Sequence, residues 1–201
     1  MRRLVEPKIV LASHNAGKLK EIRELLQPFG TKCISAQDLG LNEPKETEDS
    51  FAGNARIKAH FAAKQSGLPA LSDDSGITVD GLDGAPGVYT ADWAETKNGR
   101  DFAMAMRRVW DMLNDRGVTA PRLAQFRCTL CLAWPDGHDE VFEGISHGSL
   151  TWPMRGEFGF GFDPMFVPVG HQQTFAEMTP EERLPLTHRS DAFQKLVAGL
   201  F

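Results

Sequence analysis

Apolar and polar positions in the first third of the chain predict strands that alternate with helices. Short apolar runs of four or five residues fit strands, and apolar residues that recur every three or four positions fit helices. Gly30 is typical of a helix end, and Ser50 or Asp49 is placed to cap a helix with a face of alanines. The expected elements are a strand at residues 8–12, a helix at 19–29, a strand at 32–35 and a helix at 51–66.

The rest of the chain predicts a mixed arrangement in place of pure alternation. Pro135, Asp136 and Gly137 separate two strand-like runs, which indicates an antiparallel hairpin. The pattern therefore predicts an α/β fold with a mixed sheet. The expected elements are a strand at 68–72, a Gly/Pro-rich loop at 81–91, a helix at 102–113, hairpin strands at 126–134 and 139–146, and a closing helix at 191–200.

Composition narrows the class of protein. A chain of 201 residues with 41% hydrophobic residues predicts a single domain, 1–201, or one such domain with two lobes around a cleft. The net charge of −5 argues against a nucleic-acid polymer as partner. The sequence contains no apolar run of about 18 residues, the length that a membrane-spanning helix needs, so no membrane association is expected. Three cysteines suit a reducing compartment, so we expect a cytoplasmic protein. Cys128 and Cys131 face opposite ways in a strand and are expected to pack, not to bind zinc.

The stretch LSDDSG, residues 71–76, raises the first question of chemistry. Asp-Ser-Gly is ordinary turn sequence, so a turn after a strand is the plain interpretation. In an extended chain Asp73 and Asp74 point to opposite faces, so one of them is expected to face a cleft. Either carboxylate, with an acid from the loop at 42–49, would suit Mg²⁺. Glu46 is one candidate in that loop; nothing local separates it from its acidic neighbours.

The stretch SHNAGK, residues 13–18, follows the first strand and precedes a helix. Free backbone N–H groups at such a position attract phosphate, and Lys18 adds a positive charge. The first glycine of a Walker A loop is absent and Leu19 replaces its hydroxyl residue, so a P-loop enzyme is disfavoured. An ordinary polar turn remains the alternative.

The stretch GEFGFGFDP, residues 156–164, alternates glycines with phenylalanines. A flexible backbone with aromatic rings suits a pocket for a flat base, and Asp163 could form a hydrogen bond with the edge of that base. A buried hairpin with aromatic packing fits the same residues. His188 and Arg189 stand just before the expected closing helix and could reach a base carbonyl or a phosphate. Thr187 or Ser190 could equally be a helix cap.

Taken in order, seven stretches make the chain resemble the inosine triphosphate pyrophosphatase family, the RdgB-like dITP/XTP pyrophosphatases. They are LASHNAGKLKEI, SFAGNARIKA, LSDDSGI, GAPGVYTA, GFGFDPMF, TFAEMTPEE and THRSDAF, and they cover nearly the whole chain. The resemblance implies Mg²⁺-dependent hydrolysis of ITP, dITP and XTP to the monophosphate and pyrophosphate. It also implies an elongated, two-lobed α/β fold of the anticodon-binding or Maf-like architecture, a central active-site cleft and a homodimer.

The resemblance also implies roles for individual residues. Asp74 would be base and metal ligand, Glu46 a second metal ligand, and Lys18 a catalytic cation that stabilises charge on the phosphates. Arg183 stands where the family usually has a lysine. The implied substrate-binding residues are Ser13, His14, Asn15, Ala16, Gly17 and Lys18 for the triphosphate, then Ser75, and Phe160, Gly161, Phe162, Asp163, Arg183, His188 and Arg189 toward the base.

Chemical reasoning adds a mechanism and leaves two rivals. Attack of water on the α-phosphorus needs a base and a cation, so Asp74 is expected to bind metal and to orient or deprotonate the water. Donors from Arg189 or the backbone near Phe162 would favour 6-keto purines. A Maf-like pyrophosphatase and a nucleotide-binding regulator without turnover are the rivals. An enzyme is favoured over the regulator by four intact residues, Lys18, Glu46, Asp73 and Asp74.

Overall fold

The N-terminal part of the chain forms a β-α-β unit, as expected. The structure, a computed structural model, describes residues 1–13 and 16–201. The first helix starts earlier than expected and its α-helical part ends at Leu26, because Pro28 lacks an N–H and the chain continues as a 3-10 turn that Gly30 closes at φ 69°. The elements are β1 (Lys8–Leu11), α1 (Ala16–Leu26), a 3-10 turn (Gln27–Phe29) and β2 (Lys32–Ser35).

A mixed sheet organises the fold, which confirms the expected fold class. Strand β1 pairs in parallel with β2 and β3, whereas β4 and β9 pair antiparallel with their neighbours. Along its main path the order is β2-β1-β3-β7-β8-β9, with β4 beside β3. The remaining strands are β3 (Ala70–Val79), β4 (Pro86–Gly87), β7 (Arg122–Ala133), β8 (Asp139–Leu150) and β9 (Phe166–Pro168), with a separate small pair β5 (Glu95–Thr96) and β6 (Gly99–Arg100).

The chain divides into two units, neither of which is one continuous stretch. Strands β3, β7 and β8 run from one unit into the other, and β3 crosses the boundary between Asp74 and Ser75. Unit 1 consists of Met1–Asp74, Cys128–Gly144 and Ala192–Phe201; unit 2 consists of Ser75–Arg127 and Ile145–Asp191.

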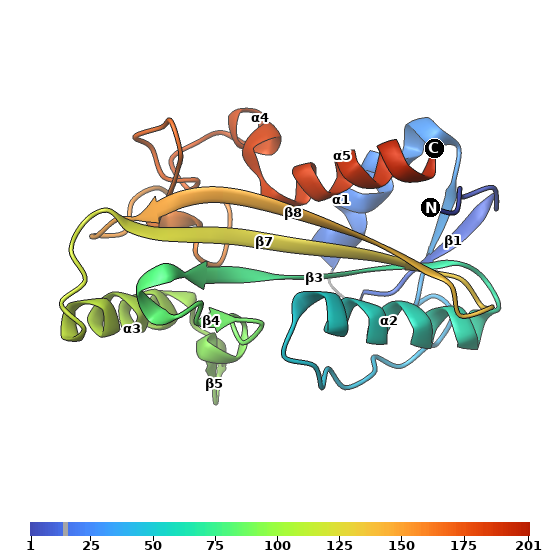
Figure 1. Cartoon of the computed structure of the whole chain (residues 1–201), viewed down its shortest axis with the longest axis horizontal. Coiled ribbons are helices and arrows are strands. Elements are labelled where there is room, and N and C mark those ends of the chain that lie inside the picture. The colour runs from blue at the N-terminus through green and yellow to red at the C-terminus, as the bar shows by residue number, and fades with distance from the viewer. Residues whose placement is uncertain (14–15) are drawn as a thin grey trace. The chain divides into compact units, whose positions relative to one another are not determined.

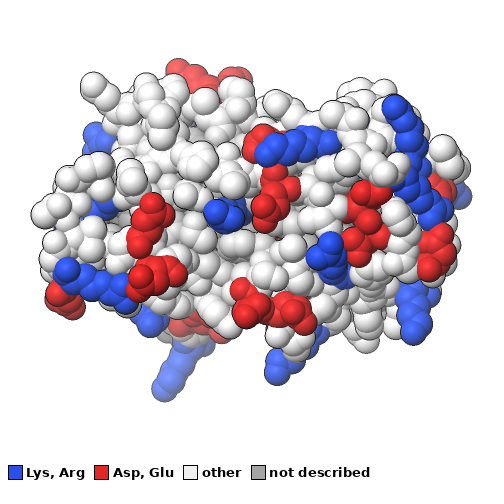
Figure 2. All heavy atoms as spheres, viewed as in Figure 1, with Lys and Arg blue, Asp and Glu red and all other residues white. Residues whose placement is uncertain are grey.

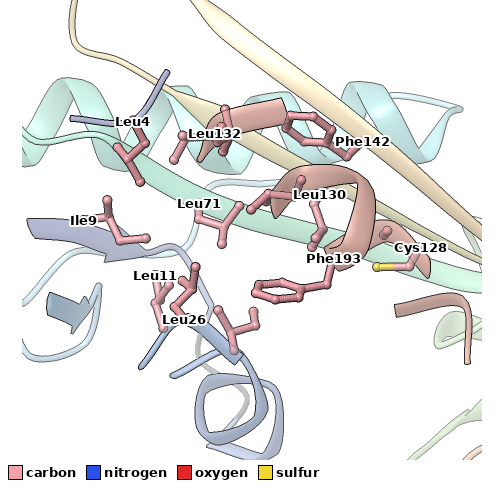
Figure 3. Packing of buried hydrophobic residues seen from close by; sticks show 14 of the residues in the cluster. Leu4, Ile9, Leu11, Leu26, Leu71, Cys128, Leu130, Leu132, Phe142 and Phe193 are labelled. Atoms are coloured by element: carbon pink, nitrogen blue, oxygen red, sulfur yellow. The ribbon is translucent and has the colours of Figure 1, made fainter. Parts of the chain in front are cut away.

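Helices cover both faces of the sheet in unit 1 (Figure 1). Ile9 and Leu11 pack with apolar side chains of α1 and of α5 (His188–Leu200), and Figure 3 shows Leu11, Leu26 and Phe193 pointing toward one another. The alternate residue Val10 packs on the alanines of α2 (Phe51–Ser66). Cys128 lies in the first cluster and Cys131 in the second, which confirms their packing on opposite faces of β7.

Unit 2 has its own core, built around α3 (Phe102–Asp115). The stripe expected for this helix is buried at Ala105, Met106, Val109 and Leu113, and Asp101 caps it by accepting the Met104 N–H. Short 3-10 turns occupy much of the remainder. They are Asp80–Leu82, Asp92–Ala94, Asp163–Met165 and Leu184–Leu186, beside the single turn α4 (Pro180–Arg183).

Several other expected boundaries were wrong, and two of them fall on candidate site residues. The strand expected to end at residue 72 continues through LSDDSG to Val79, so this stretch is strand and not turn. The closing helix begins at His188, three residues early, because the Thr187 hydroxyl accepts the Ser190 N–H and caps it. His188 and Arg189 therefore stand in the first helical turn.

Acidic and basic side chains are interspersed on the face shown in Figure 2. No single-sign area dominates that face. Across the residues that are described, none of the helices has both the length and the apolar character needed to cross a bilayer.

Candidate active site

The two carboxylates of LSDDSG are buried in the middle of strand β3. Asp73 is 3% exposed and Asp74 7%, and each has a lysine partner on a different helix. Asp73 Oδ2 lies 2.6 Å from Lys18 Nζ of α1, whereas Asp74 Oδ1 lies 3.6 Å from Lys58 Nζ of α2. Because α1 and α2 cover opposite faces of the sheet, the expectation that these carboxylates point opposite ways is confirmed. Burial of both charges is tolerable because both are paired.

Lys58 links Asp74 to the acidic loop. Its ammonium donates a hydrogen bond of 2.7 Å to Glu46 Oε1 and is 6% exposed. Asn54, one turn earlier on α2, donates through Nδ2 to Asp74 Oδ2 at 3.4 Å. Of the loop acids that local sequence could not separate, Glu46 is the one that shares a cation with Asp74.

Two groups in this cluster were missed by sequence reasoning. Asn54 and Lys58 are four residues apart and therefore share a face of α2, among alanines that pack on the sheet. A polar pair at helical spacing inside a small-residue stripe was the available signal. The hydroxyl of Ser72, two residues before Asp74 on the same strand face, donates to the Ala55 carbonyl at 2.5 Å and holds α2 against β3.

Electrostatics single out Asp74. Burial raises its pKa from 3.8 to about 6; Lys58 opposes that rise, and the negative charge of Glu46 adds to it. Burial alone would lower the pKa of Lys58, but Asp74 and Glu46 outweigh it, so its pKa is raised. The ammonium is therefore held in its charged form between two acids.

The expected phosphate loop is described only in part. His14 and Asn15 lie outside the described residues, so their predicted roles stay predictions. Ser13 is buried directly after β1, and the backbone of Ala16 and Gly17 opens α1. Lys18 follows in the first turn of that helix, where it pairs with Asp73.

In unit 2 the aromatic–glycine stretch is a loop, and its three phenylalanines have different environments. Phe162 is 1% exposed and packs edge-on against Phe102, with ring centroids 6.3 Å apart. Phe158 is 50% exposed and Phe160 67%. Phe162 is therefore a core residue, and Phe160 is the more exposed of the two rings that face solvent.

Asp163 ties this loop to α4. Its Oδ2 accepts the Phe160 N–H at 3.0 Å and the Arg183 Nη1–H at 3.0 Å. Burial raises the pKa of Asp163, while the Phe160 N–H, Arg183 and Arg189 oppose that rise. Gly159 makes the arrangement possible, because a Cβ there would overlap both Asp163 Oδ2 and Arg183 Nη1. Gly161, also at positive φ, continues the turn.

The remaining predicted residues lie on α5 and β3. The His188 ring stacks on Phe126, with centroids 5.1 Å apart and planes 15° apart, and Arg189 is 6% exposed. Ser75 is partly buried in β3, next to Asp74. The structure thus brings together Lys18, Asp73, Asp74 and Glu46 in unit 1, and Phe160, Asp163 and Arg183 in unit 2.

Metal-binding groups are few. Within residues 1–13 and 16–201, no three side chains of His, Cys, Asp or Glu gather closely enough to hold a metal ion on their own. Glu46 and Asp74 each place a carboxylate oxygen beside the Lys58 ammonium, at 2.7 Å and 3.6 Å.

Comparisons of sequence and of structure with known proteins agree on one family. The model of the Ham1 family matches residues 9–199. The chain is 64% identical to a dITP/XTP pyrophosphatase of Ruegeria pomeroyi, over 96% of this chain and 95% of that one, and 55% identical to one of Rhodopseudomonas palustris, over 98% and 97%. A solved HAM1 protein of Coxiella burnetii has a TM-score of 0.90 at 36% identity, covering 96% of this chain and 98% of that one. A dITP/XTP pyrophosphatase structure from Mycobacterium abscessus gives 0.79 at 38%, covering 94% and 98%.

Proposed function

This chain belongs to the Ham1 family, and we propose that it hydrolyses non-standard purine nucleoside triphosphates, namely dITP, ITP and XTP, to the monophosphate and pyrophosphate. Relatives named dITP/XTP pyrophosphatase, at 64% and 55% identity over nearly the full length, support this assignment. The same match disfavours the Maf-like rival. The observation that carries the proposal is the charged cluster, buried at Asp73, Asp74 and Lys58, in which Asp74 shares Lys58 with Glu46 while Asp73 holds Lys18.

Mg²⁺ fits the donors of this cluster. Magnesium prefers carboxylate oxygens, usually one or two from the protein with water and substrate phosphate completing its shell. Glu46 and Asp74 offer such oxygens, and the raised pKa of Asp74 marks a buried negative charge that its neighbours balance only in part. Bound there, Mg²⁺ would neutralise phosphate charge and lower the pKa of a bound water.

The residues of unit 1 supply the remaining chemistry at the phosphates. Asp74 would orient the attacking water and accept its proton, and a pKa of about 6 places it close to a suitable value for a base at neutral pH. Lys18 would stabilise charge on the phosphates, and the N–H groups at the start of α1 would bind them. Asp73 keeps the Lys18 ammonium in position at 2.6 Å.

The residues of unit 2 would recognise the base. The exposed ring of Phe160 would stack on a purine, and Asp163 and Arg183 would fix that ring by holding the Phe160 backbone. Arg189 and His188 would donate to the carbonyl of a 6-keto purine, which adenine lacks. In this assignment Phe162 supports the loop from the core.

A homodimer and a cytoplasmic location complete the proposal. Light scattering of the purified protein would test the first, and fractionation of cells would test the second. A monomer at micromolar concentration would remove the dimer from the proposal.

The deciding experiment measures pyrophosphate release from ITP, XTP, GTP and ATP at equal concentration, with and without Mg²⁺. We expect rapid, Mg²⁺-dependent release from ITP and XTP, slow release from GTP and ATP, and loss of release in Asp74→Asn. Equal rates on all four would leave a pyrophosphatase without base selection. Tight binding of ITP without release would favour a nucleotide-binding regulator.

A further inference from the structure

Lys58 holds an unusual position for a lysine. Its ammonium lies in the interior of unit 1, 2.7 Å from Glu46 Oε1 and 3.6 Å from Asp74 Oδ1, and only 6% of the residue is exposed. Burying a long, strongly hydrated cation requires compensation, which these two carboxylates supply. The oxygens that bind Lys58 belong to the same two side chains that the proposed function assigns to the metal ion.

The two carboxylates are held at separate points of the fold. Asp74 is part of β3 and its second oxygen, Oδ2, is occupied by Asn54 at 3.4 Å, so Oδ1 is the oxygen turned toward Lys58. Glu46 stands in the loop before α2 and its side chain is 38% exposed. Lys58 connects the partly exposed acid of the loop to the buried acid of the strand, and it does so with one positive charge.

Charges in the cluster nearly cancel. Glu46, Asp73 and Asp74 contribute three negative charges, and Lys18 and Lys58 contribute two positive ones, which leaves a net charge of −1. A divalent ion added to this set alone would turn it positive, with two cations competing for the same oxygens. A divalent ion that arrives with a triphosphate brings its own negative charge.

We propose that Lys58 is a built-in competitor of the metal ion: its ammonium occupies Glu46 and Asp74, so the protein binds a divalent cation weakly alone and strongly together with a triphosphate. This inference rests on the proposed function for the identity of the metal ligands. When the metal takes the two carboxylates, the ammonium loses both partners and becomes available to a phosphate oxygen. Metal uptake and phosphate binding are thereby coupled through one side chain.

The test uses Mn²⁺ as a spectroscopic probe, with free Mn²⁺ measured by electron paramagnetic resonance in the full-length protein without nucleotide. Lys58→Met keeps an unbranched side chain that is one atom shorter and removes its charge, and we expect it to tighten Mn²⁺ binding by about tenfold or more. Lys58→Arg, which keeps the charge, should bind Mn²⁺ as weakly as wild type.

Lys64→Met is the matched control, because Lys64 is exposed on the same helix and its loss changes the net charge equally. It should leave the Mn²⁺ affinity within about twofold, since exposed charges are strongly screened. Adding Asp74→Asn to Lys58→Met should abolish the gain, which would place the tighter binding at this cluster. If Lys58→Met does not fold, Lys58→Gln, which can still donate to Glu46, takes its place.

Inorganic tripolyphosphate provides the second measurement. In wild type it should tighten Mn²⁺ binding strongly, and in Lys58→Met this enhancement should shrink because the competitor has already been removed. Unchanged or weaker Mn²⁺ binding by Lys58→Met would overturn the inference even in an active enzyme. Tighter binding in a protein that fails to hydrolyse ITP would uphold the role of Lys58 and remove the proposed function instead.

Discussion

Replacing Asp74 with asparagine should stabilise the metal-free protein at neutral pH while abolishing its proposed hydrolysis. Asp74 is 7% exposed, and burial raises its pKa from 3.8 to about 6 although Lys58 lies 3.6 Å away. An asparagine has the shape of the protonated acid and can keep the contact with Asn54, but carries no charge that burial would penalise. The carboxylate thus weakens the fold at the pH where it is proposed to act.

The magnitude follows from linkage. The folded state binds the Asp74 proton more tightly than the unfolded chain, so the free energy of unfolding falls as pH rises from about 4 to about 6. A shift of roughly two pKa units, at about 1.36 kcal/mol each, amounts to about 3 kcal/mol above pH 7. The attraction to Lys58 is already contained in that pKa. Asp74→Asn should remove this penalty, which is nearly absent below pH 4.

Urea unfolding in the presence of a chelator, at pH 8 and at pH 4.5, measures the effect. Asp74→Asn should exceed wild type in unfolding free energy by about 3 kcal/mol at pH 8 and by only about 1 kcal/mol at pH 4.5. Asp111→Asn, on the exposed side of α3, is the control and should show no comparable pH dependence. A variant that is no more stable than wild type at pH 8, or equally stabilised at both pH values, would refute the reasoning.

Three further predictions concern the loop of unit 2 and the cap of α2. Gly159→Ala places a Cβ, at a residue with φ 76°, where it overlaps Asp163 and Arg183. This variant should raise the KM for ITP by about tenfold and leave inhibition by tripolyphosphate unchanged. An equal loss of tripolyphosphate binding would contradict a role at the base. Arg183→Met removes the cation that forms an ion pair of 3.0 Å with the buried Asp163 and should lower the unfolding free energy by about 2 kcal/mol in urea, whereas Arg183→Lys should recover part of it. Ser50→Ala removes the acceptor of the Gly53 N–H at 3.1 Å and should cost about 1 kcal/mol in thermal unfolding, with no change in KM.

Local signals predicted the helices of this fold well. The Ser50 cap, the end of α2 at Ser66 and the apolar stripe of α3 are encoded by neighbours within a few positions, and all three are confirmed. The hairpin around residues 135–137 and the mixed sheet follow from equally local turn and strand patterns. Boundaries at 16 and 188 were missed because helices there begin one turn before the apolar periodicity becomes visible.

Strand β3 shows what local patterns could not supply. Two adjacent carboxylates are unfavourable in a buried strand, so the sequence read as a strand end followed by a turn. The strand continues because Asp73 finds Lys18, 55 positions earlier, and Asp74 finds Lys58, 16 positions earlier. Neither pairing is visible until the fold brings α1 and α2 to opposite faces of the sheet.

Lys58 was overlooked for a related reason. A lysine on a helix is usually solvated, and only its place on the buried stripe with Asn54, Ala55 and Ala59 marks it as an interior residue. Those alanines are fully buried and let α2 lie close to the sheet, where the Ser72 hydroxyl reaches the Ala55 carbonyl. The small-residue face therefore does more than fill the core: it brings Asn54 and Lys58 within reach of Asp74. A larger residue at Ala55 or Ala59 would move both polar groups away from the carboxylate, so the packing of α2 and the charge balance of the site depend on the same positions.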